Sequence, residues 1–483
     1  MSALTALARV SAVSSGVAQP IATVRHVHLS SRPLVFVPLA LAGEANAPLA
    51  ALVGSSPDAP QLLFVPQPRN RDQRFEFAAK LAAILLSYVD SFCGETETVP
   101  AGRNTEPRER YVDAPQILVP NGGGVGFVRL FGRSTRFRRT EGEYAVDASV
   151  PLLGRWLTFF AERSEYPGSS LLVSMTGALS MHWATGQSAV EDANLAALVG
   201  WIDPPSGMSG AEAALEAEDP LTWPPAGPAT DPTFDNEVLA PAIEAGSLSM
   251  LESALRSQLM PTWELMWRGV SLLRGLPPGA RVEQRWTADR DAFTGFASYV
   301  AEGGYPQAKR DVAVAAAQRL ARLERAQALY DAQRAYDDPL LLAEYRLSGE
   351  AFAGTVIASS PDRIDDSGKR RVLRPHVTVR SEDPVLLGPG ASVVSPARPS
   401  QTGSFVSVSG PDVVLELSGG MGRGLTTPPG SVPEVGERLT YTTLTESYQA
   451  PAAFPSREET PWTHGGPPVE YVPDDEDAAE DWS

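Results

Sequence analysis

Lysine is the scarcest basic residue in this chain of 483 residues, occurring only at positions 80, 309 and 369. A phosphate-binding P-loop needs a glycine-rich turn ending in Gly-Lys-Ser/Thr, because its N–H groups and the lysine ammonium hold the phosphates together. None of the three lysines lies in that motif, since Lys369 follows Gly368 but precedes Arg370. The sequence therefore argues against a Walker-type NTPase, and we expect no bound cofactor.

Cysteine is scarcer still. The single Cys93 excludes an intramolecular disulfide and an all-cysteine metal site. Its place at the end of a helical segment favours a small buried side chain over a nucleophile, which would need a nearby histidine. Long apolar runs that would span a membrane are also missing, and residues 1–19 have too weak an apolar centre for a secretory signal. We expect a soluble, cytoplasmic protein that does not enter a membrane.

Positive charge is in deficit. The chain carries 40 Lys plus Arg against 58 Asp plus Glu, a formal net charge of -18, which argues against a basic nucleic-acid coat. Hydrophobic residues at 43% and charged residues at 20% are typical of a chain that buries a core. The length predicts two to four domains.

Signatures of catalysis are sparse. The sequence has no Gly-x-Ser-x-Gly elbow and no Ser-x-x-Lys pair. Among five histidines, His26 and His28 are two residues apart, so in a strand they would present two imidazoles on one face to a metal ion. His182 is the candidate for a further ligand. The alternative interpretation places both histidines on the solvent face of an edge strand.

Two glycine- and arginine-rich segments follow. Residues 121–126, Asn-Gly-Gly-Gly-Val-Gly, predict a turn between two strands, because Phe127 stands where a dinucleotide-binding loop would have its last glycine.

Downstream lies a group of arginines interleaved with aromatic residues, a mix that suits a phosphate backbone and stacked bases. The members of this arginine cluster are Arg129, Arg133, Arg136, Arg138 and Arg139. Intramolecular pairing and a solvated face are the alternatives, and Arg69, Arg71 and Arg74 would enlarge a patch.

Residues 1–202 predict an N-terminal α/β domain with covering helices. The expected strands are residues 34–41, 61–65, 116–120 and 126–131, and the expected helices are residues 72–92, 150–163, 169–183 and 190–201. Residues 203–232, rich in Pro, Gly, Ala and acidic residues, indicate a linker.

Residues 233–346 predict a helical region. Trp263 and Trp267, four residues apart, would share one helical face. Residues 307–336 contain no Gly or Pro and predict a long, stalk-like helix. Its expected apolar stripe consists of Val312, Ala316, Leu320, Leu323, Ala326 and Tyr330.

Residues 347–448 switch to short β-branched or alternating runs separated by Gly, Pro, Asp and Ser, which predicts a small β-barrel. Residues 449–483 are rich in Pro and acid and predict a disordered acidic tail. The expected fold class is therefore a multidomain α+β protein: an α/β layer, a helical middle, a long helix and a C-terminal barrel.

A long helix leading into a small barrel resembles the stalk and accessory barrel of Upf1-like superfamily-one helicases. The resemblance is carried by residues 354–358 (Gly-Thr-Val-Ile-Ala), 380–387 and 413–417. It implies a helicase-associated subunit, but one without a motor, because the chain lacks the ATP-binding loop of that family. Convergence on a common barrel is the alternative explanation.

Together these features favour a non-catalytic scaffold or adaptor subunit of a protein or protein–nucleic-acid assembly. We expect one or more protein partners, with nucleic acid as a further candidate partner through the arginine cluster. The alternative hypothesis is a metal-dependent hydrolase or nuclease centred on His26 and His28 in the N-terminal domain. The sequence leaves the oligomeric state open.

Overall fold

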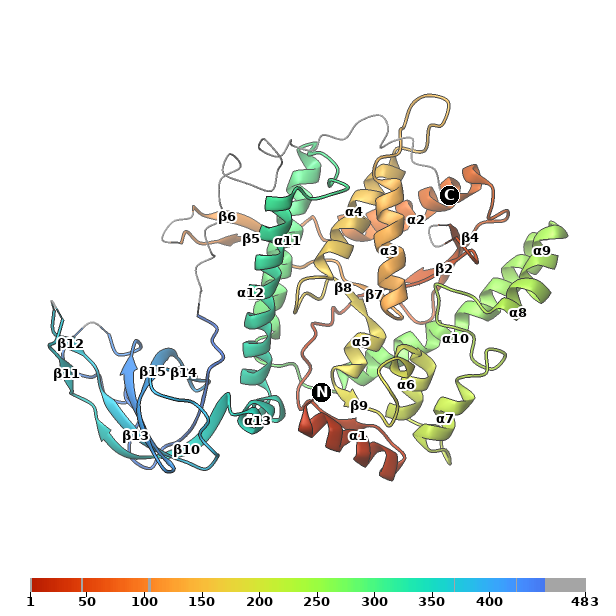
Figure 1. Ribbon diagram of the computed structural model, residues 1–483. Coiled ribbons are helices and arrows are strands. Elements are labelled where there is room, and N and C mark those ends of the chain that lie inside the picture. The colour runs from red at the N-terminus through yellow and green to blue at the C-terminus, as the bar shows by residue number, and fades with distance from the viewer. Residues whose placement is uncertain (1, 45–46, 103–105, 369, 423, 448–483) are drawn as a thin grey trace. The chain divides into compact units, whose positions relative to one another are not determined.

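The computed structural model describes residues 2–44, 47–102, 106–368, 370–422 and 424–447 (Figure 1). Within them, residues 7–323 form one compact unit, here called the large unit. Residues 324–447 together with 2–6 form a second, the barrel unit. The expected α+β class with a C-terminal barrel is confirmed, whereas the predicted disordered tail lies outside the described residues.

A five-stranded mixed sheet organises the large unit, in the order β4-β3-β2-β7-β8. Its strands are β2 (Leu34–Ala40), β3 (Pro48–Gly54), β4 (Gln61–Phe64), β7 (Ile117–Val119) and β8 (Leu172–Ser174). The first three form antiparallel pairs, whereas β7 runs parallel to both β2 and β8. Every residue of β2 and β3 is buried, because helices cover both faces of the sheet.

Alternate residues of β2 enter two different cores. Leu34 and Phe36 belong to the core beneath one group of helices, and Val35 and Val37 to the core on the opposite face. The first group is α2 (Arg71–Asp90), α3 (Gly122–Thr135), α4 (Ser149–Arg163) and α11 (Val282–Ala301). The second is α5 (Met175–Ser180), α6 (Leu195–Ile202) and α10 (Leu248–Arg274).

The remaining elements outside the barrel have ten residues or fewer, apart from the helices α1 and α12. They are α1 (Ala3–Ser15), β1 (Gln19–Pro20), β5 (Thr96–Val99), β6 (Arg108–Tyr111), β9 (Trp183–Ala184), η1 (Glu191–Ala193), α7 (Gly210–Glu216), α8 (Pro232–Phe234), η2 (Asp235–Leu239), α9 (Ala240–Glu244), α12 (Ala313–Asp337) and α13 (Pro339–Ser348). Among the described residues, none of the helices combines the length and hydropathy needed to cross a bilayer.

The glycine segment begins a helix rather than a second strand. Asn121 caps α3 by accepting a hydrogen bond from the N–H of Gly124 at 3.0 Å, so the strand expected at residues 126–131 is wrong. α3 then crosses α4 closely, because a Cβ on Gly132 would lie 2.8 Å from the backbone nitrogen of Thr158. The close packing of α3 on α4 therefore requires Gly132, which lies downstream of the segment that resembled a turn.

One further expectation fails for a tertiary reason. The helix expected at residues 169–183 is divided into β8, which extends the sheet, and α5. Residues 203–232, expected to be a linker, lie within the large unit and contain α7. Whether the segments on either side of it fold independently stays a prediction.

The barrel unit contains a closed six-stranded barrel in the order β10-β13-β16-β15-β14-β17, as expected. Its strands are β10 (Ala351–Ser360), β13 (His376–Ser381), β14 (Ser392–Ser395), β15 (Arg398–Ser409), β16 (Asp412–Ser418) and β17 (Arg438–Thr442). A separate hairpin consists of β11 (Ile364–Asp365) and β12 (Val372–Leu373). In β16 the alternate residues Val413, Leu415 and Leu417 are all buried in the barrel core.

The sequence predicted the long helix, but not its first residue or all of its buried positions. α12 begins at Ala313, six residues later than the expected start at position 307. Leu320, placed on the expected apolar stripe, is 58% exposed, whereas Val314 and Ala332 are buried. The expected stripe is therefore right at Tyr330, which is buried, and wrong at Leu320, because many positions of this alanine-rich helix are small enough for either environment.

Candidate functional site

The two candidate metal ligands do not share a face. Residues 24–28 form an irregular segment rather than a strand, and the buried ring of His26 stacks on His182 with centroids 5.7 Å apart. The half-buried ring of His28 stacks on Trp286 at 3.9 Å. In the described part of the chain, no group of three or more His, Cys, Asp or Glu side chains is placed to hold a metal. The metal-site hypothesis finds no support there, and the solvent-face alternative is wrong for His26.

Side chains take over the hydrogen bonds that a neighbouring strand would make to this segment. The N–H of His26 donates to Nε2 of His182 at 2.9 Å, and that of His28 to Oγ of Ser170 at 3.0 Å. Two residues further, the N–H of Ser30 donates to Oε1 of Gln116 at 2.9 Å. Every second amide is thus bound by a side chain, so these polar residues hold the segment in the fold.

The packing around His182 and His28 keeps both of these imidazole rings neutral. Nδ1 of His182 lies 2.7 Å from the carbonyl oxygen of Ala178, so the ring donates there and accepts at Nε2, as a neutral imidazole does. Burial, reinforced by Arg25 and Arg290, lowers the pKa of His28 to about 4. Both imidazoles are therefore neutral at physiological pH.

A buried carboxylate lies close to this segment. Asp289 on α11 is 1% exposed and accepts hydrogen bonds from Arg163 (2.9 Å), the hydroxyl of Ser169 (2.7 Å) and the N–H of Ser170 (2.6 Å). Burial raises the pKa of this carboxyl, although Arg163 and the hydrogen bonds oppose the shift. With both oxygens occupied by groups of the fold, Asp289 serves as a structural anchor.

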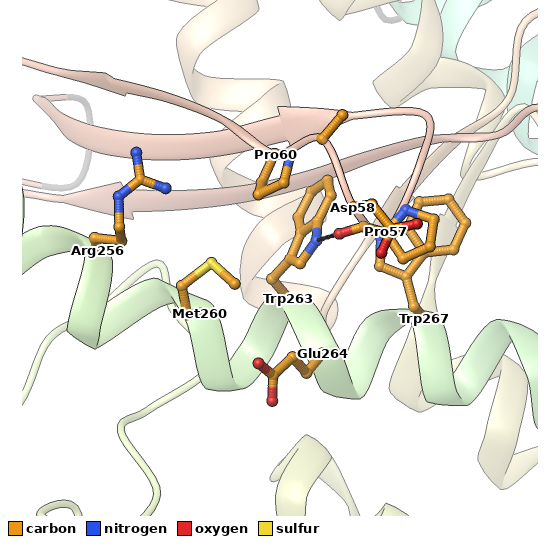
Figure 2. A pocket seen from close by; sticks show the side chains of 9 residues that line it. Pro57, Asp58, Pro60, Arg256, Met260, Trp263, Glu264 and Trp267 are labelled. Carbon is orange, nitrogen blue, oxygen red and sulfur yellow. Dashed lines mark hydrogen bonds between the residues drawn. The ribbon is translucent and has the colours of Figure 1, made fainter.

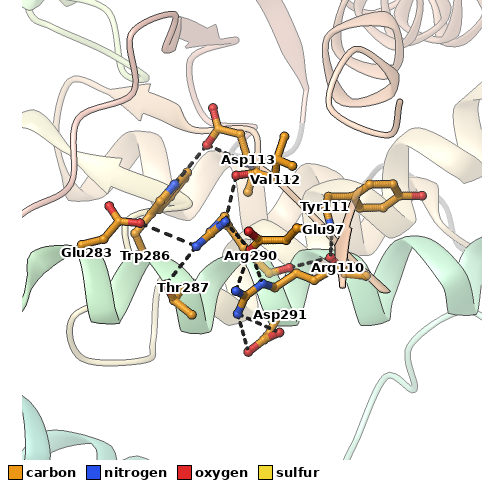
Figure 3. Close-up of polar contacts among 12 residues, drawn as sticks. Glu97, Arg110, Tyr111, Val112, Asp113, Glu283, Trp286, Thr287, Arg290 and Asp291 are labelled. Carbon is orange, nitrogen blue, oxygen red and sulfur yellow. Dashed lines mark hydrogen bonds and ion pairs between the residues drawn. The ribbon is translucent and has the colours of Figure 1, made fainter. Parts of the chain in front are cut away.

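A second charged network fastens the β5–β6 hairpin to α11 (Figure 3). Glu97 accepts from Arg110 at 2.6 Å and from Arg290 at 2.9 Å. Arg110 also reaches Asp291 at 3.5 Å, and Arg290 donates to the carbonyl of Val112 at 2.9 Å. Hydrogen bonding to Arg110 lowers the pKa of Glu97. These charges pair with one another and position the hairpin.

The arginine cluster is divided between interior and surface. Arg136 is 4% exposed and donates to the carbonyls of Gln307 (2.8 Å) and Ala308 (3.2 Å). Arg138 is also buried, and its Nε donates to the carbonyl of Ser134 at 2.9 Å. These two arginines satisfy backbone carbonyls of the large unit and are not displayed to a phosphate backbone.

The other three members of the cluster lie at the surface. Arg129 forms an ion pair with Glu165 at 2.9 Å, while Arg133 and Arg139 are exposed. The intramolecular pairing weighed as an alternative therefore accounts for Arg129. A continuous basic patch made of all five arginines does not form.

The upstream arginines do meet the cluster, but around a core aromatic ring. The guanidinium of Arg71 lies 4.6 Å, and that of Arg138 5.3 Å, from the ring centroid of Phe75. Arg74 is buried, pairs with Glu44 at 2.6 Å and donates to a backbone carbonyl. The expected convergence thus produces cation–π packing rather than an open surface.

Cys93 has the character expected of a structural residue. It is half-buried against the core, and its sulfur lies 3.7 Å from the carbonyl oxygen of Val89. Burial raises the pKa of the thiol, which is opposite to what a nucleophile needs.

A groove of about 730 Å³ lies between α10 and the loop that joins β3 to β4 (Figure 2). Loop residues 57–60 form one side. Arg256, Met260, Trp263 and Trp267 line the other, three or four residues apart along α10. The groove is therefore bounded by a single helical stripe and a proline-containing turn.

Trp263 forms its rigid floor. The side chain is 1% exposed, and the indole N–H donates to the carbonyl of Pro57 at 2.9 Å. A Cβ on Gly54 would lie 3.3 Å from the same indole, so the hairpin backbone packs directly on the ring. The groove is thus preformed in the folded protein.

Trp267 supplies an unused donor. Its ring lies 6.0 Å from that of Trp263 at an interplanar angle of 69°. Its Nε1–H is buried, and no described residue accepts a hydrogen bond from it. A buried donor of this kind costs free energy that an acceptor from a ligand would recover.

The sequence indicated only half of this site. The spacing of Trp263 and Trp267 predicted a shared helical face, but the Pro57–Pro60 turn that completes the groove carries no signal pointing to α10.

No family model, curated protein or solved structure matches this chain. The chemistry of the groove is therefore derived from its own side chains.

Proposed function

We propose that this protein is a non-catalytic adaptor, which holds a segment of a partner protein in the groove between α10 and the β3–β4 loop. The observation that carries the proposal is the pairing of a locked indole floor, Trp263, with a second indole whose donor is unused, Trp267. Tryptophan in a preformed pocket is a common energetic centre of protein interfaces.

The partner is assigned as a protein rather than nucleic acid. Arg136 and Arg138 are buried and Arg129 is paired, so three of the five arginines expected to follow a phosphate backbone are engaged within the fold, which leaves Arg133 and Arg139 at the surface. A groove lined by indole, proline and methionine side chains instead suits an apolar peptide segment.

A place beside a nucleic-acid helicase belongs to the same proposal. The resemblance of residues 347–448 to an accessory barrel motivates it, and the closed barrel is compatible with it. Under this hypothesis the helicase would be among the proteins that the adaptor assembles.

A pull-down from the native host tests the adaptor role. The tagged full chain and its Trp267→Ala variant are compared, and each protein captured by the wild type alone is purified and mixed with the chain. A one-to-one complex that the variant fails to form is expected. Identical captures by both chains, or a divalent ion or nucleotide held tightly by the purified protein, would contradict the proposal.

A further inference from the structure

The groove between α10 and the β3–β4 loop has a chemistry that selects its occupant. From it we infer that the partner segment is an extended, proline-rich peptide that carries arginine. This inference rests on the proposed adaptor role and specifies what the groove binds.

The shape and lining of the groove favour an extended chain. Pro57 and Pro60 lie opposite the indoles of α10, and proline, indole and methionine side chains supply most of the lining (Figure 2). Trp263 is 1% exposed and forms the base, so the half-buried indole of Trp267, at 69° to it, offers the face against which a pyrrolidine ring packs. Aromatic-lined grooves of this type recognise the polyproline II conformation, which is already ordered before binding.

The unused donor of Trp267 matches the backbone of such a peptide. A polyproline II chain makes no internal hydrogen bonds, so its carbonyls are available as acceptors. Trp267 is only half-buried as a residue and lines the groove, whereas its Nε1–H is buried. We expect the ring to turn when the peptide binds, so that Nε1–H meets a peptide carbonyl. A helical ligand would lack this match, because its carbonyls are bonded within the helix.

The charged side chains at the rim of the groove favour a peptide that contains arginine. The groove is lined by two carboxylates, Asp58 and Glu264, against one cation, Arg256. That cation already lies 3.4 Å from the carboxylate of Glu252, so the rim is net negative. Arginine pairs with a carboxylate and stacks on an indole face, whereas an acidic segment would be repelled.

The protein's own acidic segment, residues 449–483, is therefore a poor occupant. It carries nine Asp and Glu residues against one arginine. Like charge at the rim disfavours it, and a partner with the opposite charge fits better.

Fluorescence anisotropy with the full chain tests the inference. The probe is a labelled peptide of about ten residues with proline at every third position, matching the three-residue turn, and flanking arginines. Matched peptides replace arginine by glutamate, or proline by glycine. We expect the arginine–proline probe to bind most tightly and both replacements to weaken binding.

Variants connect binding to the groove. Trp267→Ala should weaken binding roughly 30-fold, as for an interface hot spot. Glu264→Arg should weaken the arginine probe about tenfold and improve the glutamate probe. Leu248→Ala, on the same helix but 57% exposed and outside the groove, should leave binding unchanged. If circular dichroism shows that Trp267→Ala is unfolded, the test depends on Glu264→Arg, which changes an exposed residue.

Three results would overturn the inference: equal affinity for arginine and glutamate probes, equal affinity for proline and glycine probes, or tighter binding of a peptide with the sequence of residues 470–481, which contain most of the acidic residues of the segment. The adaptor role fails separately. If no probe binds but Glu264→Arg still abolishes the complex with a purified partner, the adaptor role stands and only the assigned peptide chemistry is wrong.

Discussion

The backbone N–H of His26 donates to Nε2 of His182, 156 residues further along the chain, at 2.9 Å. This bond uses the ring nitrogen that a metal ion would need and ties the 24–30 segment to the end of α5. The same pattern recurs at His28 with Ser170. Of the histidines considered as metal ligands, His182 thus accepts a backbone hydrogen bond with its ring, while His26 and His28 are held through their backbone N–H groups.

Removing this acceptor should destabilise the large unit. His182→Phe keeps an aromatic ring but leaves the buried N–H of His26 without this partner, and we expect a loss of about 1–3 kcal/mol in the free energy of unfolding. Urea titration followed by tryptophan fluorescence measures it, because every tryptophan in the described part of the chain lies between residues 156 and 286. His182→Gln, which keeps an acceptor on its side chain, should lose less. Equal losses would contradict the assigned role.

Acid should destabilise the same unit through His28. Its pKa is about 4 in the folded protein against an ordinary 6.5, so between these values the unfolded chain binds the proton and the folded chain does not. The contribution to stability is complete above about pH 6.5 and is lost as the pH falls toward 4, by up to about 3 kcal/mol.

His28→Phe provides the matched comparison, since it can stack on Trp286 but cannot titrate. The wild type should lose more free energy of unfolding than this variant when the pH is lowered from 7 to 4. Parallel pH profiles would show that His28 is not held neutral by its surroundings.

Two aspartates on α11 should differ sharply in their importance. Asp289→Ala leaves Arg163 and the N–H of Ser170 without a buried acceptor, and we expect a loss of about 3–5 kcal/mol. Asp291→Ala removes partly exposed ion pairs with Arg108 and Arg110 and should cost less than about 1 kcal/mol. Thermal and urea denaturation of the two variants measure the contrast, and similar losses would refute it.

Charge removal should separate structural arginines from exposed ones. Arg136→Met removes charged donors from two backbone carbonyls and should destabilise the large unit by roughly 1.5–3 kcal/mol. The exposed Arg133→Met should have little effect on urea denaturation.

The nucleic-acid hypothesis is best tested at the exposed positions. Reversal of Arg136 or Arg138 would confound lost binding with lost folding, whereas Arg133→Glu and Arg139→Glu preserve the interior. We expect single-strand and duplex binding, measured across salt, to be absent or unchanged in these variants. A salt-dependent affinity that they abolish would restore nucleic acid as a partner.

Local patterns along the chain determined much of the secondary structure. The apolar periodicity of α2, the β-branched runs of the barrel and the strand at β2 were each read from neighbouring residues, because one helix face or one strand face is specified within a few residues. The missing motifs were equally local: a Walker loop and a disulfide framework are absent from the sequence itself.

Tertiary structure alone decided which polar residues face one another. The floor of the groove joins Trp263 to Pro57, 206 residues apart, and Arg136 meets carbonyls 171 and 172 residues away. A buried arginine that donates to a carbonyl and an exposed arginine that could bind a phosphate look the same in the sequence. Their roles differ because the folded chain places different partners beside them. The periodicity of a segment predicts at most which of its sides is buried. The residues that this side contacts are determined by tertiary packing.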